Sequence, residues 1–402
     1  VFGQVVGIIG KNGMGKSTAI QILSGQLQPN LGKEQADFKD LITYFKGTEA
    51  QAYFEKLRDG NISVAVKPQL VDAIPRQFDG TVAQLLQQVS TDQDKINKYV
   101  KDLALEQVLD RDIKTVSGGE LQRIAIAATV LKDANVYFFD EPTSYLDIKQ
   151  RLIVSRFIRE LANDDTAVVV IEHDLIILDY MTDAIHLMYG KENAYGVASL
   201  PKSTKAGINT YLDGFLRDEN IRFRNYTIHF HRVAEKESIG KHLVISWKDI
   251  KKQLGDFHLE APSGDLHKHE VVGVLGQNGI GKTSFMKILA DVVAPDNGSI
   301  DGDIVVSYKP QYLEASDEPV ASVLKDAMAH KALLINPLQL EPLFEQTLSQ
   351  LSGGQLQRVA VAAALARKAD VYLLDEPSAY LDIEQRLIVS KVIKDFMLQK
   401  GK

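Results

Sequence analysis

The chain has 402 residues, a length that favours two or three domains over one. Hydrophobic residues make up 45% and charged residues 25%, and no apolar run reaches the roughly 18 to 20 residues that a membrane helix needs. The absence of cysteine excludes disulfides, thiolate metal sites and iron–sulfur ligation within these residues, and it favours a cytoplasmic protein. A net charge of −7 argues against a surface that binds nucleic acid everywhere.

Two short apolar runs, at residues 5–9 and 271–275, predict buried parallel strands, and each leads into a glycine-rich turn and a helix. Both turns match the P-loop, in which backbone N–H groups and a lysine surround the phosphates of a nucleotide and a hydroxyl binds Mg²⁺. The helix N-terminus adds to this anion site. The candidate nucleotide-binding residues are Asn12, Gly13, Gly15, Lys16, Ser17 and Thr18, and Asn278, Gly279, Gly281, Lys282, Thr283 and Ser284.

The first copy is longer than the second between the P-loop and the next shared motif. Lys16 and Gln69 are 53 residues apart, whereas Lys282 and Gln311 are 29 apart. Within the extra length, apolar residues at positions 38, 41, 42 and 45 follow one helical face, and Thr48 with a glutamine three residues later resembles a capping box. We expect a helix–loop–helix insertion at about 36–60, with aromatic residues that pack it onto the domain or contact a partner.

A stretch at residues 116–147 recurs at residues 351–382 with a constant offset of 235, so the chain contains two copies of one unit. Each stretch opens with a Ser-Gly-Gly sequence that leads into an amphipathic helix, which predicts a second anion site in each copy. A domain that holds one nucleotide has a use for this site only if it serves the γ-phosphate bound by a neighbour. The residues are Ser117, Gly118, Gly119 and Glu120, and Ser352, Gly353, Gly354 and Gln355.

An apolar strand at residues 136–139 is expected to bring Asp140 and Glu141 to the sheet edge where α/β proteins bind ligands. Adjacent carboxylates at a strand end point to opposite sides, so Asp140 can hold Mg²⁺ while Glu141 polarises a water. Asp147 closes this motif. The second copy has Asp375, Glu376 and Asp382 in the same order.

A further apolar strand at residues 166–171 ends beside His173, a candidate to bond the γ-phosphate. The same offset puts the counterpart of His173 at position 408, whereas the sequence ends at Lys402. We therefore expect the second unit to lack its last catalytic residue and its last strand or strands. We also expect that the chain is trimmed at both ends.

Residues 201–252 carry eleven Lys and Arg against six Asp and Glu, which fits either a solvated linker or a hinge that contacts phosphates. Residues 221–224 and 228–231 alternate apolar and polar side chains, as edge strands do. The histidine pairs His229/His231 and His267/His269 lack a third ligand and predict no metal site. The expected domains are 1–200, a hinge at 201–252, and 253–402.

These motifs resemble twin ATP-binding cassettes of the ABC superfamily, an α/β fold with two tandem P-loop ATPase units. Lys-Pro-Gln before both glutamines, Tyr-Leu-Asp in both repeats, the single insertion and the basic hinge resemble subfamily E, the ribosome-recycling ATPases also called RNase L inhibitors. The resemblance implies that Gln69 and Gln311 reach Mg²⁺ and the attacking water. It also implies ribosome splitting after termination, small-subunit and rRNA contact through the hinge, and a release-factor-like partner. The family's N-terminal iron–sulfur domain has no counterpart in these residues.

The resemblance further implies a monomer whose cassettes pair head to tail around two ATP molecules. Lys16, Glu141 and His173 would then face the Ser352 segment, and Lys282 with Glu376 would face the Ser117 segment. The expected Mg²⁺ ligands are Ser17, Gln69, Asp140, Thr283, Gln311 and Asp375. Two alternatives stay open: a fused ATPase subunit of a membrane transporter, and a subfamily-F translation factor, for which a long charged helical linker is expected.

Overall fold

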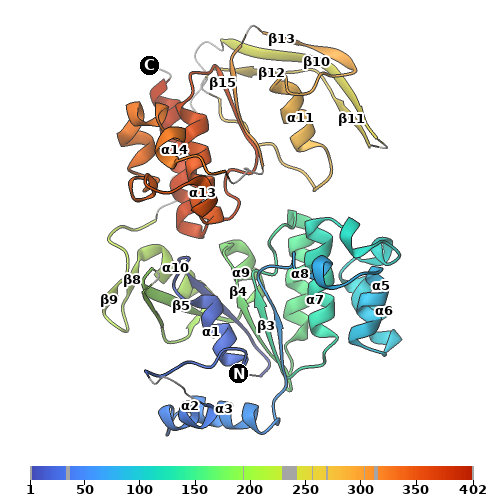
Figure 1. Cartoon of the computed structure of the whole chain (residues 1–402), viewed down its shortest axis with the longest axis vertical. Coiled ribbons are helices and arrows are strands. Elements are labelled where there is room, and N and C mark those ends of the chain that lie inside the picture. Colours follow the sequence, from blue (N-terminus) through green and yellow to red (C-terminus); the bar gives the residue numbers. More distant parts are fainter. Residues whose placement is uncertain are drawn as a thin grey trace. The chain divides into compact units, whose positions relative to one another are not determined.

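The computed structural model describes residues 2–32, 37–192, 194–228, 242–255, 257–268, 270–302, 304–311 and 316–400. The chain divides into two compact units, Val1–His231 and Arg232–Lys402, drawn in Figure 1. The division falls inside the predicted hinge at 201–252. The predicted strand at 228–231 and the residues His229, His231 and His269 lie wholly or partly outside the described residues.

The first unit is built on a seven-stranded sheet with the order β2-β3-β4-β1-β5-β6, in which β7 also pairs with β5. Neighbours from β2 to β5 run parallel, and β6 and β7 run antiparallel to β5. The strands are β1 (Val5–Gly10), β2 (Val64–Lys67), β3 (Val136–Asp140), β4 (Ala167–Ile171), β5 (Ala184–Lys191), β6 (Tyr195–Ala198) and β7 (Lys202–Ser203). The predicted strands at residues 5–9, 136–139 and 166–171 are therefore confirmed.

Strand β3 shows why these runs are apolar throughout. Tyr137 and Phe139 pack into a core beneath helices α5 to α8, whereas Val136 and Phe138 pack into a core on the opposite face with Ile20 of α1. A parallel strand covered on both faces needs hydrophobic residues at every position. Because both faces of the sheet are covered, polar groups gather where the strands end.

The helices of this unit cover the two faces of the sheet (Figure 1). They are α1 (Lys16–Leu23), α2 (Phe38–Tyr44), α3 (Glu49–Arg58), α4 (Ile74–Gln77), α5 (Val82–Val89), α6 (Gln93–Asp102), α7 (Gly118–Val130), α8 (Ile148–Leu161), α9 (Leu175–Met181) and α10 (Thr204–Asp213), with 3-10 turns η1 (Glu106–Val108) and η2 (Ile113–Thr115). The short strands β8 (Phe215–Leu216) and β9 (Ile221–Arg222) form a hairpin after α10. Of the two, β9 lies in the alternating segment at 221–224.

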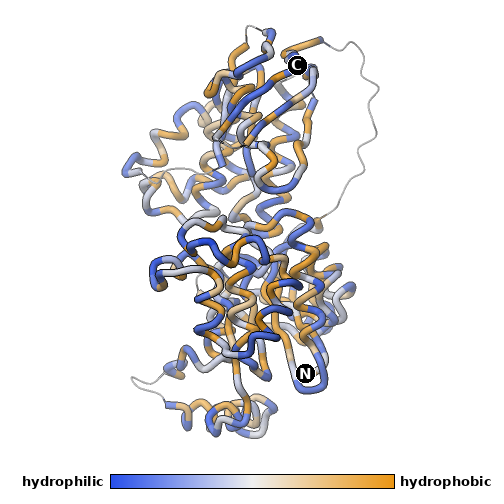
Figure 2. The backbone as a smooth tube through the Cα atoms, turned by 90° about the vertical axis from the view of Figure 1, so that its right-hand side faces the viewer, coloured by the Kyte–Doolittle hydropathy of each residue, from blue (hydrophilic) through white to orange (hydrophobic). Residues whose placement is uncertain are grey.

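The expected helix–loop–helix insertion is present as α2 and α3, whose alternating hydrophilic and hydrophobic stretches are visible in Figure 2. Phe54 is buried and contacts the rings of Phe38 and Phe45, and the hydroxyl of Tyr53 donates to the Leu23 carbonyl, so four of the five aromatic residues pack the insertion. Tyr44 is 68% exposed.

The predicted capping box at Thr48 is wrong. The Gln51 side chain accepts from the Gly47 N–H, and no side chain caps α3. Asp37 and Asp40 form a capping box at the start of α2 instead. Asx side chains are strong N-caps, so the first helix of the insertion is the one with a fixed start.

The second unit contains a four-stranded antiparallel sheet of β10 to β13 and a separate parallel pair, β14 with β15. The strands are β10 (Leu243–Leu254), β11 (Phe257–Ala261), β12 (Gly264–His267), β13 (Asn297–Asp301), β14 (Val306–Lys309) and β15 (Val371–Leu374). The helices and turns are α11 (Lys282–Leu289), α12 (Val320–Val323), η3 (Asp326–His330), η4 (Lys331–Ile335), η5 (Glu341–Leu343), η6 (Leu348–Gln350), α13 (Gly353–Ala366) and α14 (Ile383–Lys400). Trp247 and Phe257 pack into the core under α11.

The predicted strand at residues 271–275 is wrong for this structure: these described residues form no ladder, and Leu275 is 92% exposed. The equivalent β1 is held between β4 and β5, and Val5 pairs with Val168. No described strand of the second unit pairs with residues 271–275, and backbone N–H and C=O groups form a strand only where a neighbouring strand bonds them.

Candidate functional site

The first P-loop has the backbone shape that its glycines permit. Gly13 and Gly15 have φ values of 75° and 80°, in the left-handed region that side chains with a Cβ avoid. Lys16 starts α1 and is 7% exposed, and its Nζ donates to the carbonyls of Gly10 and Lys11, both at 2.8 Å. The ammonium group therefore lies at the centre of the loop, where it can bind β- and γ-phosphate oxygens.

The second P-loop repeats this geometry although its strand is missing. Gly279 and Gly281 have φ values of 77° and 93°, and Lys282 starts α11. Its Nζ donates to the carbonyls of Gly276 and Gln277 at 2.7 and 2.8 Å. Asn12 and Asn278 lie in the two loops, and Thr18 and Ser284 lie in the first turns of α1 and α11.

Each unit brings a P-loop hydroxyl against the aspartate at the end of a strand. In the second unit, Thr283 Oγ1 donates to Asp375 Oδ2 at 2.7 Å, and in the first unit Ser17 makes the same bond to Asp140. Burial raises the pKa of Asp140, and the bond from Ser17 opposes this effect. A hydroxyl and a carboxylate are oxygen donors of the kind that Mg²⁺ takes alongside phosphates and waters, so both pairs fit this ion.

Glu141 lies at the centre of the first site. Its Oε1 accepts from Gln69 Nε2 at 2.8 Å and lies 3.3 Å from His173 Nε2, and its Oε2 accepts from Ser144 at 3.0 Å. Burial alone would raise the pKa of this carboxyl, but His173, Ser144 and the charge of Lys16 outweigh burial and lower the pKa to about 2. Glu141 is therefore ionised at neutral pH, the form that can polarise a water.

The second site lacks this surrounding shell. Glu376 has the same left-handed backbone as Glu141, with φ values of 45° and 47°. Within the described residues, no hydrogen bond joins Gln311 to Glu376, and no histidine lies beside that carboxylate. Gln69, Glu141 and His173 thus come together in the first unit. In the described part of the second unit, the bonded side-chain pair is Thr283 with Asp375, while Lys282 bonds carbonyls of its own loop.

The Ser-Gly-Gly segments open α7 and α13 with capping boxes. The Ser117 N–H donates to Glu120 Oε2 at 2.7 Å, and Glu120 also pairs with Arg111 at 3.1 Å. The Ser352 N–H donates to Gln355 Oε1 at 2.8 Å. The two segments therefore share a backbone shape but differ by one charge.

The second glycine of each segment lies close against the neighbouring Tyr-Leu-Asp loop. A Cβ on Gly119 would lie 3.1 Å from the Tyr145 carbonyl oxygen, and one on Gly354 would lie 3.0 Å from that of Tyr380. The residues Gly118 and Gly353 face the rings of the same two tyrosines. Asp147 and Asp382, at the ends of these loops, cap α8 and α14 by accepting from backbone N–H groups, each at 2.9 Å.

Sequence reasoning missed two buried lysines beneath the catalytic carboxylates. Lys67 and Lys309 are 0% and 1% exposed, and burial lowers the pKa of each to about 8. The lysine of the repeated Lys-Pro-Gln is the signal that marks them in the sequence. Gln122 and Gln357 were not predicted either, and their side chains donate to the carbonyls of Glu141 and Glu376.

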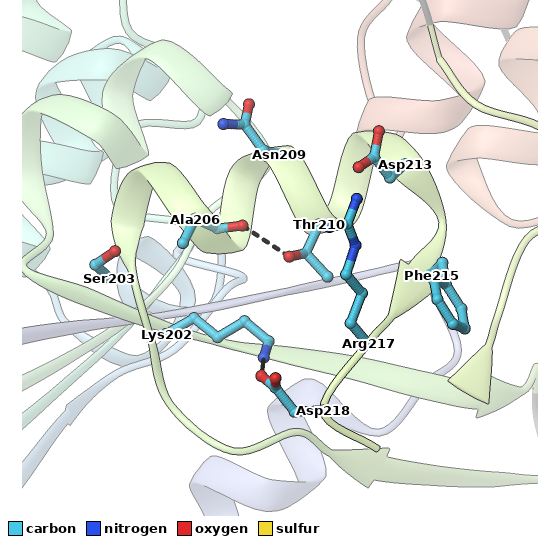
Figure 3. A pocket seen from close by; sticks show the side chains of 9 residues that line it. All are labelled: Lys202, Ser203, Ala206, Asn209, Thr210, Asp213, Phe215, Arg217 and Asp218. Carbon is cyan, nitrogen blue, oxygen red and sulfur yellow. Dashed lines mark hydrogen bonds and ion pairs between the residues drawn. The ribbon is translucent and has the colours of Figure 1, made fainter. Parts of the chain in front are cut away.

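A separate pocket of about 450 Å³ lies against α10 in the first unit and contains none of the predicted nucleotide-binding residues. Figure 3 shows Lys202 paired with Asp218 across the pocket, and Arg217 beside Thr210. The side chain of Asn209 also lines it. The pocket belongs to the segment predicted as the basic hinge.

In each of the two units, a P-loop lysine, an aspartate paired with a hydroxyl, and a helix opened by Ser-Gly-Gly define an ATPase of the ABC type. The family model described as "ABC transporter" matches residues 2–144 and 259–379. The chain is 51% identical to "Uncharacterized ABC transporter ATP-binding protein MJ0719" of Methanocaldococcus jannaschii, with 97% of this chain and 66% of that protein covered. It is 44% identical to "ABC transporter E family member 1" of Arabidopsis thaliana, with 100% and 69% covered.

Among solved structures, one named "RNase-L Inhibitor" superposes with a TM-score of 0.92 at 49% identity, covering 100% of this chain and 79% of that chain. The chain therefore belongs to the ABC family of ATPases, in subfamily E, as its motifs predicted. It spans about two thirds of the length of the curated relatives it matches. Among the helices of the described residues, none combines the length and apolar character needed to cross a bilayer.

Proposed function

We propose that this chain binds two ATP–Mg²⁺ and uses closure and hydrolysis to split ribosomes into subunits after termination. The observation that carries this proposal is the presence of two complete sets of P-loop and carboxylate residues in a chain that resembles ribosome-associated proteins over its whole length. Two solved relatives are titled as an archaeal ribosome recycling factor in complex with stalk protein aP1, and as ABCE1 bound to the ribosome with archaeal Pelota. Cytoplasmic location follows from this role.

The chemistry at each site follows from the bonded groups. Lys16 and Lys282 neutralise phosphate charge, and the hydroxyl–aspartate pairs hold Mg²⁺, which supplies Lewis-acid stabilisation of the transferred phosphoryl group. Glu141 polarises the attacking water and Gln69 orients it, because both side chains already converge at 2.8 Å. His173 stabilises the negative charge that develops on the γ-phosphate.

We infer that the working unit is a head-to-tail pair of cassettes within one chain. The Ser117 segment would complete the nucleotide site of the second cassette, and the Ser352 segment that of the first. Each segment presents backbone N–H groups at a helix N-terminus, where anions bind. ATP bound in both sites then favours the closed state, and hydrolysis releases it.

The proposed partners are the small ribosomal subunit, its rRNA at the hinge, and a release-factor-like protein. The pocket beside α10 lies in the basic segment, and its lining includes Arg217 and Asn209, side chains of the kinds that bind phosphates and sugars, while Lys202 is paired with Asp218. The insertion of α2 and α3, with its exposed Tyr44, is a second candidate contact.

Cosedimentation with small ribosomal subunits tests this proposal. With a nonhydrolysable ATP analogue, the chain should travel with the subunit in a gradient, and with ADP it should remain at the top. The double variant Glu141→Gln/Glu376→Gln should be retained with ATP itself. Equal sedimentation in every nucleotide state would contradict the proposal.

A role in translation initiation is a second candidate, because relatives 41% identical to this chain in Chaetomium thermophilum and Saccharomyces cerevisiae carry the name "Translation initiation factor RLI1". The two roles differ in what they require. Splitting of whole ribosomes should depend on a release-factor-like protein, whereas retention on isolated small subunits together with initiation factors should not.

A further inference from the structure

Two buried lysines lie outside the nucleotide-contacting set in equivalent places. Lys67 is the last residue of β2 and Lys309 is the last residue of β14. Their side chains are 0% and 1% exposed, although lysine is almost never fully buried without a partner. Burying an ammonium group costs desolvation free energy, and its occurrence at equivalent places in both units indicates a specific role.

Both lysines donate to the backbone of the catalytic carboxylate pair. Lys67 Nζ lies 3.0 Å from the carbonyl oxygen of Asp140 and 3.3 Å from that of Glu141. Lys309 Nζ lies 2.8 Å from the carbonyl oxygen of Asp375 and 3.5 Å from that of Glu376. Each ammonium thus bridges the two peptide groups that carry the metal-binding and water-polarising side chains.

The helix that each Ser-Gly-Gly segment opens, α7 or α13, is the signature helix of its unit, and one of its glutamines bonds the carbonyl of the same glutamate. Gln122 Nε2 donates to the carbonyl oxygen of Glu141 at 2.7 Å, and Gln357 Nε2 donates to that of Glu376 at 2.6 Å. A carbonyl oxygen has two lone pairs, and a lysine and a glutamine occupy both of them. The strand that precedes the Gln69 loop, the signature helix and the catalytic glutamate therefore meet at one oxygen atom.

The glutamate at this junction has an unfavourable backbone. Glu141 and Glu376 have φ values of 47° and 45°, and a residue other than glycine in this region costs about 1 to 3 kcal/mol unless its surroundings fix it. This conformation turns the carboxylate of Glu141 toward Gln69, Ser144 and His173. In this conformation its carbonyl oxygen accepts from both a lysine and a glutamine.

We propose that Lys67 and Lys309 are positioning residues of the ATPase reaction: with Gln122 and Gln357 they hold the catalytic glutamates in the left-handed conformation that aims each carboxylate at its water. This inference rests on the proposed roles of Glu141 and Glu376. It adds that hydrogen bonds to the main chain of each catalytic glutamate fix the position of its carboxylate. Movement of the signature helix would then shift that carboxylate through the bond from Gln122 or Gln357.

The double variant Lys67→Met/Lys309→Met tests the proposal, because methionine keeps the length and removes the donors. We expect kcat for ATP to fall about 10- to 100-fold, as for a misplacement of about 1 Å, while KM and the affinity for a fluorescent ATP analogue stay within about two-fold. Lys67→Arg/Lys309→Arg should recover part of kcat, because arginine also donates. Lys101→Met, on the exposed face of α6, is the matched control and should leave both constants unchanged.

An epistasis test separates positioning from a general loss of structure. In the Glu141→Gln/Glu376→Gln background, the two methionines should cause no further loss of kcat, because the groups that they position are already gone. A further loss of the same size as in the wild-type background would overturn the proposal, and so would unchanged kcat or a rise in KM alone.

If the methionine variant fails to fold, as judged by thermal melting, Gln122→Leu/Gln357→Leu decides the question. These changes remove the second donor from the same carbonyls, and we expect the same split between kcat and KM. Unchanged kcat in a folded glutamine variant would overturn the proposal. A normal kcat in Glu141→Gln/Glu376→Gln would instead show that these glutamates are not the general bases. That result would contradict the proposed function rather than the positioning role of the lysines.

Discussion

The two cassettes differ most in what supports their P-loops. Strand β1 is held on both sides in a seven-stranded sheet, and Ile9 is fully buried, whereas Leu275, at the same place in the second copy, is 92% exposed. Even so, both loops carry left-handed glycines and a lysine bonded to two carbonyls. The loop shape is therefore set by local residues and the helix that follows, whereas the strand depends on neighbours distant in sequence.

The largest expected effect concerns catalysis at the two sites. Glu141→Gln/Glu376→Gln should retain ATP and lower turnover about 100- to 10,000-fold, the range for loss of a positioned general base. Steady-state ATP hydrolysis and binding of a fluorescent analogue measure the two properties separately.

The single variants sharpen the comparison between cassettes. If only the bonded shell around Glu141 supports fast turnover in this chain, Glu141→Gln alone should cause most of the loss and Glu376→Gln little. Equal losses would show that the missing bond between Gln311 and Glu376 does not limit the second site.

Acid stability tests the bonded carboxylate that distinguishes the first site, Glu141. The pKa of Glu141 is lowered from 4.5 to about 2 in the folded chain, so its contribution to stability is complete above pH 4.5 and is lost as pH falls through 2. At about 1.4 kcal/mol per pKa unit, the contribution is about 3 kcal/mol. Urea unfolding of the wild type and Glu141→Gln without nucleotide or Mg²⁺ should differ most above pH 4.5. A difference independent of pH would contradict the assignment.

A matched pair of glycines tests the support of the two loops. A Cβ on Gly7 in β1 would lie 2.8 Å from Ile185 Cγ2, whereas one on Gly273, at the same place in the second copy, would have no atom within 4 Å. Gly7→Ala should destabilise the first unit by about 1 to 3 kcal/mol through overpacking, and Gly273→Ala should have almost no effect. Thermal melting measures both, and equal shifts would show that residues 271–275 are packed in solution.

The features predicted correctly from the sequence are those that depend on local residue pattern or on the internal repeat. Both P-loops, the strand that ends at Asp140 and the two helices of the insertion lie where periodicity and spacing put them. The prediction of a strand at 271–275 was wrong because an apolar run does not show whether other strands lie beside it to bond its backbone. The role of Lys67 was not predictable, because its partners are carbonyl oxygens, which every residue has, and only the fold brings them within 3.3 Å.

The smallest expected effect comes from the one charge that separates the two Ser-Gly-Gly segments. Glu120 is anchored by Arg111 at 3.1 Å, so part of its charge is neutralised before it meets a nucleotide phosphate. An exposed charge interaction of this kind contributes about 0.2 to 1 kcal/mol, equivalent to a change of no more than about five-fold in rate. Glu120→Gln should therefore raise kcat slightly and the reciprocal Gln355→Glu should lower it, both measured at saturating ATP. Identical rates in the two variants would mean that the segments are interchangeable, and that the asymmetry between the cassettes arises from the surroundings of Glu141 and Glu376 alone.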